Sequence, residues 1–125
     1  MKSEIEERVL MYETDVNTKK IAFHVQLLAN SEQMKDYPFT KMLIERGVTE
    51  EEWQEVMALL ATLDARFHEE AEEGLLDFTP LLIHFAGMLN MKLHPDEAIL
   101  AIKKEGYYSE LMIAFEHVRR GTSLR

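Results

Sequence analysis

The chain of 125 residues is long enough for one domain with its own core, and its 46% hydrophobic and 30% charged residues are typical of a folded protein. It contains no cysteine, which excludes disulfides and zinc sites with sulfur ligands and fits a reducing compartment such as the cytoplasm. The N-terminus lacks an apolar signal core, and the longest uncharged run, residues 78–91, is too short to span a bilayer. We therefore expect a cytoplasmic protein without a membrane segment.

The net charge of −9 is concentrated in one segment. Residues 45–77 hold eleven acidic and two basic residues, whereas the charges on either side of this segment nearly cancel. Phosphate binding requires clustered Lys and Arg, and the only such cluster is the short C-terminal stretch "HVRRGTSLR". Nucleic acid is therefore not an expected partner.

The first predicted helix covers residues 3–31, which is long for so small a protein. Its apolar residues at spacings of four and three share one face: Ile5, Val9, Tyr12 and Val16. A second apolar set is out of phase with the first by one residue, so the helix either changes partner or breaks near Asn17: Ile21, Val25 and Leu28. A continuous helix would extend over about 40 Å, beyond the roughly 35 Å diameter of such a domain, and its overhanging apolar stripe would need a second chain.

The middle of the chain predicts a short helix followed by a long one. Pro38 at a first helical position and Gly47 as a stop predict a helix over residues 39–46. The sequence "TEEE" that begins at Thr49 is a capping box, which opens a helix that ends at Gly74. The apolar residues of this helix lie on one face: Trp53, Val56, Leu60, Leu63 and Phe67.

The most apolar stretch of the chain is "LLDFTPLLIHFAGMLNMKL". Thr79 and Pro80 begin a helix there that is apolar nearly all round, which is typical of the buried centre of a bundle. His84 and Gly87 are three residues apart on one stripe, so Gly87 would let a second helix cross closely beside His84. We expect His84 to be a hydrogen-bonded core residue rather than a catalytic group or ligand, because no Ser, Cys or paired carboxylate accompanies it.

Two shorter helices complete the chain. Pro95 begins one that ends at Gly106, with acidic residues in its first turn and basic residues in its last. Ser109 caps the other, whose apolar residues hold helical spacing: Leu111, Met112, Phe115 and Val118.

No segment alternates apolar and polar residues with the period of two that a strand requires. The predicted fold class is therefore all-α: a compact helical bundle of about six helices, with a long N-terminal helix and an apolar central helix. We expect one helical domain over residues 1–125, in which residues 1–15 form an N-terminal helical extension and residues 119–125 a basic tail.

Several motifs occur in the order found in a known family: "VQLL", "DYPF", "LIERGVTEEE", "GLLDFTPLLIHFAGMLNMKL" and "EAILAIKKEGYYSELM". Over about residues 16–118 the chain resembles the YhaI-like family, small helical proteins of spore-forming bacteria whose function is not established. The resemblance implies an all-helical fold that associates with itself, and it carries no catalytic or binding residues. The segments before about Asp15 and after Val118 depart from the family pattern.

Motifs for common chemistries are absent from the sequence. None of the five histidines has Glu three residues before it, as di-iron bundles require, and no zinc-protease, phosphate-loop or nucleophile-elbow motif occurs. The remaining metal candidate is Asp64, His68 and Glu72, spaced i, i+4, i+8 on one helix face. In so acidic a segment this spacing arises readily by chance, which favours a solvated face with an Asp–His pair. We expect no cofactor and no bound metal.

An acidic cluster at the end of the long helix breaks a physical rule. Glu69, Glu70, Glu72 and Glu73 lie in the last turn, where the exposed carbonyls already make the potential negative. One interpretation is a docking surface for a basic partner, for which a neighbouring subunit offers three arginines: Arg119, Arg120 and Arg125. The favoured interpretation is that water and salt screen the cluster sufficiently.

These observations favour a non-enzymatic, self-associating helical module that acts in protein–protein interaction or regulation. We expect a homo-oligomer, a dimer or trimer, held by the first helix and by apolar surface of the central and final helices, with an unknown protein as a further partner. The alternative is a small-molecule or metal-binding regulator that uses His84 or the row Asp64, His68 and Glu72. The predicted interaction residues are Ile5, Val9, Tyr12, Val16, Glu69, Glu70, Glu73, Arg119 and Arg120.

Overall fold

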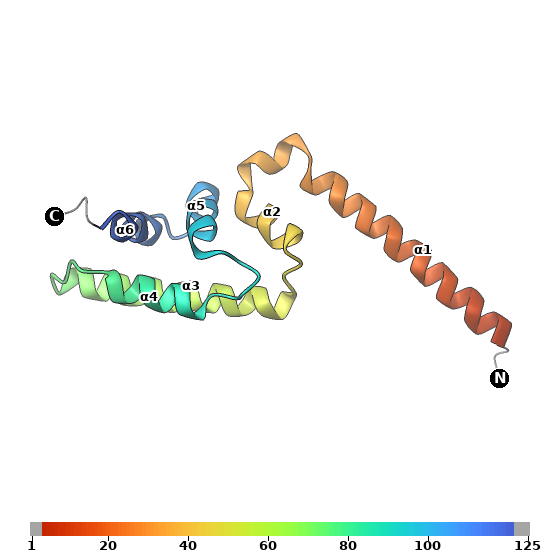
Figure 1. Ribbon diagram of the computed structural model, residues 1–125, viewed down its shortest axis with the longest axis horizontal. Helices are drawn as coiled ribbons and strands as arrows, with labels where there is room; N and C mark the ends of the chain where they lie inside the picture. The colour runs from red at the N-terminus through yellow and green to blue at the C-terminus, as the bar shows by residue number, and fades with distance from the viewer. Residues whose placement is uncertain (1–3, 122–125) are drawn as a thin grey trace. The chain divides into compact units, whose positions relative to one another are not determined.

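The computed structural model describes residues 4–121, and all regular elements in that range are helices (Figure 1). Six α-helices and one short 3-10 helix occupy this part of the chain, so the predicted all-α fold is confirmed. Within the same range, none of the helices combines the length and the apolar composition that a bilayer crossing requires. The chain divides into two units, Met1–Met34 and Lys35–Arg125, which are described in turn.

The first unit consists chiefly of α1, Glu4–Ala29, which is one continuous helix (Figure 1). The alternative of a break near Asn17 is therefore wrong. The Thr14 hydroxyl donates to the Leu10 carbonyl at 2.9 Å, and the Thr18 hydroxyl donates to the Thr14 carbonyl at 2.8 Å. These weak helix formers thus have their hydroxyls satisfied inside the helix. At 1.5 Å per residue, its 26 residues extend over about 39 Å.

The 3-10 helix η1 (Glu32–Asp36) precedes five α-helices: α2 (Pro38–Glu45), α3 (Glu50–Glu72), α4 (Thr79–Met88), α5 (Pro95–Glu105) and α6 (Ser109–Arg119). In the second unit, α5 packs against α2 and α6, and α4 packs against α3 and α6. The predicted order of short and long helices is confirmed, with ends within one or two residues of those expected.

The helix ends follow the local chemistry that the sequence predicts. At the start of α3 the Glu52 backbone N–H donates to Thr49 Oγ1 at 3.1 Å, and the Thr49 N–H donates to Glu52 Oε1 at 2.9 Å, so the capping box is confirmed. Gly74 (φ 83°) and Gly106 (φ 95°) follow α3 and α5 in the left-handed conformation that glycine adopts without strain.

The start of α6 differs from the prediction. Ser109 is its first residue rather than its cap, and the preceding position belongs to Tyr108, which has a left-handed backbone (φ 48°) and makes no side-chain capping bond. The Tyr108 carbonyl accepts from the Met112 N–H at 2.9 Å, which is the first hydrogen bond of the helix. Because the Tyr108 side chain packs against the core, tertiary packing sets this turn and overrides the capping preference of serine.

The hydrophobic core of the second unit draws on all five of its α-helices. The Phe85 and Phe115 rings lie 5.3 Å apart between centroids, where α4 meets α6. The buried apolar side chains are Phe39, Val56, Leu60, Leu63, Phe67, Leu81, Phe85, Leu89, Leu93, Ala98, Ile99, Ala101, Ile102, Leu111, Met112 and Phe115. Four of the five residues predicted for the core face of α3 are among them. The fifth, Trp53, is 43% exposed and borders an open hollow with Leu43 and Val48.

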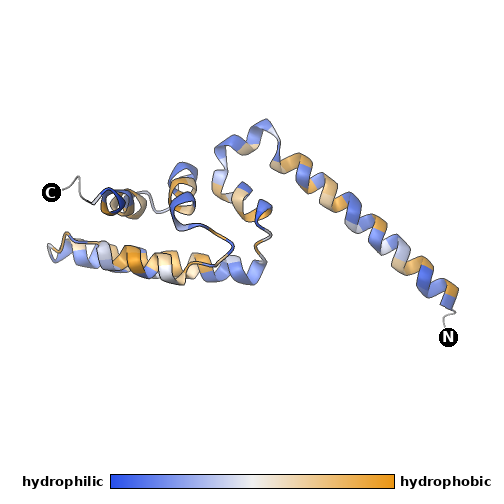
Figure 2. Ribbon diagram, in the orientation of Figure 1, coloured by the Kyte–Doolittle hydropathy of each residue, from blue (hydrophilic) through white to orange (hydrophobic). Residues whose placement is uncertain are grey.

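The prediction that α4 is the buried centre of the bundle is wrong. Only Leu81 and Phe85 are buried within it, whereas Ile83 and Met88 are 65% and 67% exposed. Figure 2 shows this mostly apolar helix in the second unit. The short helices of so small a unit cover one face of α4 but do not enclose it, since a small unit buries a smaller part of its surface.

His84 and Gly87 lie on the uncovered part of α4. His84 is only half-buried, and its Nδ1 lies 3.3 Å from Nη1 of Arg66 on α3, so the expected core histidine is a surface residue with a polar partner. A Cβ built on Gly87 would meet no atom within 4 Å. The predicted close helix crossing at Gly87 is therefore wrong, because no described helix crosses at that point.

Candidate functional site

The large apolar side chains of α1 are exposed to solvent. Ile5, Val9 and Tyr12, three of the predicted interaction residues, are 73%, 50% and 70% exposed, and the fourth, Val16, is half-buried. Apolar residues recur along the whole of α1 in Figure 2. An exposed apolar stripe of this length is a mark of an interaction surface, since soluble monomers rarely expose contiguous apolar patches of this kind.

The continuity of α1 extends the predicted stripe toward the C-terminus. Phe23 and Leu27 follow Val16 by seven and eleven residues, so they lie on the same face, and they are 56% and 55% exposed. We call the whole set the Val16 stripe: Ile5, Val9, Tyr12, Val16, Phe23 and Leu27. It covers about 33 Å of helix, which is the 22 steps from Ile5 to Leu27 at 1.5 Å per residue.

The second apolar set lies on a different side of α1. At 100° per residue, Ile21 and Leu28 are rotated by roughly 140–160° from Ile5, and Leu10 lies in the same direction. We call this set the Ile21 face, and its members are exposed: Leu10, Ile21, Val25 and Leu28. The phase change predicted from the sequence is thus a second apolar face of one straight helix.

The charges of α1 are separated along its length. Residues 4–16 contain five acidic side chains and one basic one, Arg8, whereas residues 17–29 contain Lys19 and Lys20 and no acid. Lys19 Nζ lies 3.3 Å from Asp15 Oδ2 where the two halves meet. The helix therefore presents an acidic end and a basic end beside its apolar stripe.

The predicted metal row on α3 does not form a metal site in the described residues. His68 Nε2 lies 3.5 Å from Asp64 Oδ1, which is the expected local pair. Glu72 does not join them, and no three His, Asp or Glu side chains in residues 4–121 gather closely enough to hold a metal ion.

The acidic cluster at the end of α3 is solvent-accessible, and the arginines suggested as its partners already have partners in their own chain. Glu69 and Glu73 are exposed and Glu70 is half-buried. Arg119 Nε lies 2.8 Å from Asp96 Oδ1, and Arg120 Nη2 lies 3.5 Å from Glu116 Oε2. Arg125 lies outside the described residues. Contact between this cluster and another subunit stays a prediction.

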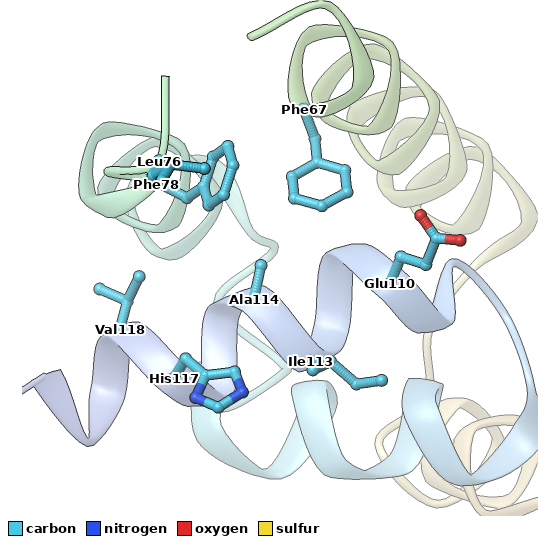
Figure 3. A pocket seen from close by; sticks show the side chains of 8 residues that line it. All are labelled: Phe67, Leu76, Phe78, Glu110, Ile113, Ala114, His117 and Val118. Carbon is cyan, nitrogen blue, oxygen red and sulfur yellow. The ribbon is translucent and has the colours of Figure 1, made fainter. Parts of the chain in front are cut away.

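A pocket that the sequence did not predict lies between α3, the α3–α4 connection and α6 (Figure 3). It has a volume of about 420 Å³ and is open to solvent. Figure 3 shows Phe67, Phe78 and Leu76 on one side and α6 on the other. The remaining lining residues are Glu110, Ile113, Ala114, His117 and Val118. The apolar residues Leu76 and Ile113 gave no sign of the pocket, because a sequence does not show that they are exposed.

A buried carboxylate joins α5 to α6 in the second unit. Glu116 is 6% exposed, and its Oε1 lies 2.8 Å from Nζ of Lys103. The hydrogen bond from Lys103 lowers the pKa of Glu116 and outweighs burial, which acts in the opposite direction. This pair was not predicted from the sequence, because Lys103 was considered only as a basic residue in the last turn of its helix and Glu116 was not considered.

Comparison with protein families matches residues 12–120 to a model described as "Protein of unknown function (DUF1878)". The match begins at Tyr12 within the Val16 stripe and extends through α6, so it covers most of the described helices. On this evidence the chain belongs to the DUF1878 family, whose function is not known.

Proposed function

We propose that the chain is a non-enzymatic helical module that associates with itself through the Val16 stripe of α1. The observation that carries this proposal is the exposure of that stripe: five of its six residues are at least half exposed over about 33 Å of helix. Fully burying one large apolar side chain contributes roughly 1.5–3 kcal/mol relative to leaving it exposed, so burial of the stripe against a second copy supplies a large driving force.

The resemblance to YhaI-like proteins supports the same proposal, because self-association is what that resemblance implies. A homo-oligomer would also multiply the surfaces of the second unit. Each chain of the oligomer carries the pocket lined by Phe67, Leu76 and Ile113. A protein partner with several binding segments would therefore bind the oligomer more tightly than it binds a single chain. The proposed role is therefore assembly and protein–protein interaction rather than catalysis.

The first test is the mass of the whole chain by light scattering behind a sizing column, at low salt and in 1 M salt. Charge screening in 1 M salt acts over only about 3 Å, so an assembly held by apolar burial keeps its mass there. We expect a dimer or a trimer of the 14.6 kDa chain at micromolar concentration under both conditions. A monomer at low salt would refute the proposal, and an oligomer that dissociates in 1 M salt would contradict its apolar basis.

A further inference from the structure

We infer that two copies of α1 pair antiparallel, about a two-fold axis at Val16; this inference rests on the self-association proposed above. The stripe is symmetric about that residue. Val9 and Phe23 lie seven residues to either side of Val16, and Ile5 and Leu27 lie eleven residues to either side. A two-fold axis perpendicular to the helix at Val16 therefore places Val9 opposite Phe23, and Ile5 opposite Leu27, of the second copy.

The spacing also fits two straight helices. From Ile5 to Val16 and from Val16 to Leu27 the stripe repeats every 11 residues, which is about 3.67 residues per turn and close to the 3.6 of a straight α-helix. The stripe therefore keeps its direction along α1, and both helices can remain in contact over the whole of it without marked supercoiling.

The acidic and basic residues that flank the stripe favour the antiparallel direction over the parallel one. Glu13 and Lys20 lie on one side of it, and Asp15 and Lys19 on the other. In the antiparallel pair residues on the same side meet, so Glu13 approaches Lys20, and Asp15 approaches Lys19, of the second copy. In a parallel pair opposite sides meet, which brings Glu13 to Asp15 and Lys19 to Lys20. Exposed pairs of this kind contribute little affinity, but their signs select the orientation.

Cysteine cross-linking tests the orientation directly, because the chain has no cysteine of its own. We would prepare three full-length variants: Val16→Cys, Ile5→Cys and Leu27→Cys. Each variant would be co-expressed with a second chain that carries a different tag and is either the same variant or one of the other two. The purified pairs would then be oxidised mildly or treated with a short thiol cross-linker. Circular dichroism of each variant controls for folding.

The inference predicts that Val16→Cys links to itself, and that Ile5→Cys links to Leu27→Cys in the mixture far more than either links to itself. In the antiparallel pair the two copies of residue 5 are about 33 Å apart, beyond the reach of a disulfide. Efficient linkage of Ile5→Cys to itself would overturn the antiparallel pair and leave the proposed self-association intact. Linkage of Val16→Cys without the mixed linkage would overturn the symmetric register. Failure of Val16→Cys to link at all would overturn the two-fold axis at Val16, whereas a monomeric mass of the native chain would refute the self-association itself.

Discussion

Lys92, in the turn between α4 and α5, contacts the carboxylate of Glu52 in the first turn of α3, with Nζ 2.6 Å from Oε1. Glu52 also accepts from the Thr49 N–H within the capping box and from the Asn90 side chain at 3.1 Å, while Lys92 Nζ donates to the Gly47 carbonyl at 3.0 Å. The Glu52 carboxylate thus completes the cap of α3 and also binds two residues of the α4–α5 connection, Asn90 and Lys92.

This arrangement predicts an acid-sensitive contribution to stability. Hydrogen bonds, first from Lys92 and then from Thr49, lower the pKa of Glu52 from 4.5 to about 2. A carboxylate whose pKa is lowered by folding stabilises the protein fully above its unfolded pKa, and this contribution is lost as the pH falls through the folded value. Melting temperatures of the native chain and of Glu52→Gln should therefore differ most above pH 4.5 and converge toward pH 2. A constant difference over that range would show that ionisation of Glu52 is not responsible.

The buried pair of Lys103 and Glu116 predicts a large difference between two neighbouring lysines. Lys103→Met leaves the nearly buried Glu116 carboxylate with an ion pair to Arg120 at 3.5 Å in place of the closer one to Lys103, which should cost about 1–3 kcal/mol of unfolding free energy. Lys104→Met, at an exposed position of the same helix turn, should change it by no more than about 0.5 kcal/mol. Urea titrations measure both values, and equal effects would remove the special role assigned to Lys103.

Two glycines should respond in opposite directions to alanine. Gly106 ends α5 with φ 95°, so Gly106→Ala forces a left-handed backbone on a residue with a Cβ and should cost about 1–2 kcal/mol. Gly87 lies inside α4, where a Cβ would meet no atom within 4 Å, and Gly87→Ala should gain up to about 1 kcal/mol in helix propensity. Thermal unfolding of the two variants distinguishes them. If Gly87→Ala destabilises the protein, another helix must pack closely against Gly87, which would contradict the structure.

A charge exchange on α1 should report contact between two copies. Lys20→Glu places a carboxylate beside Glu13 of the second copy and should weaken self-association at low salt by up to about 2 kcal/mol, because the pair occurs twice. Glu13→Lys combined with Lys20→Glu should restore it. The two residues are seven apart, about 10 Å along one helix, so rescue cannot come from a contact within the chain. Sedimentation velocity measures the dissociation constants, and a double variant as weak as Lys20→Glu would speak against the antiparallel pair.

Local chemistry explains what could be predicted from the sequence. The capping box at Thr49 and the helix stop at Gly106 depend only on residues within one turn, and both are present in the structure. The core face of α3 was predicted because Val56, Leu60 and Leu63 keep helical spacing.

Features that depend on the second unit as a whole could not be predicted. Periodicity cannot show how many neighbours a helix has, so the apolar α4 was placed at the centre although one of its faces is exposed. Glu116 is buried because Lys103 on another helix lies beside it, and a single segment carries no sign of that pairing. Phe23 and Leu27 were predictable in principle, since they follow Val16 at helical spacing, but the prediction required that α1 be continuous.

The mass of the Val16→Glu variant tests the central claim most directly. Its matched control is Ile21→Glu, which makes an apolar-to-acidic change on the other face of α1, at a residue that is 62% exposed. If copies join through the Val16 stripe, sedimentation equilibrium at micromolar concentration should give 14.6 kDa for Val16→Glu and an oligomer for both the native chain and Ile21→Glu. An oligomer of unchanged mass for Val16→Glu would contradict the account.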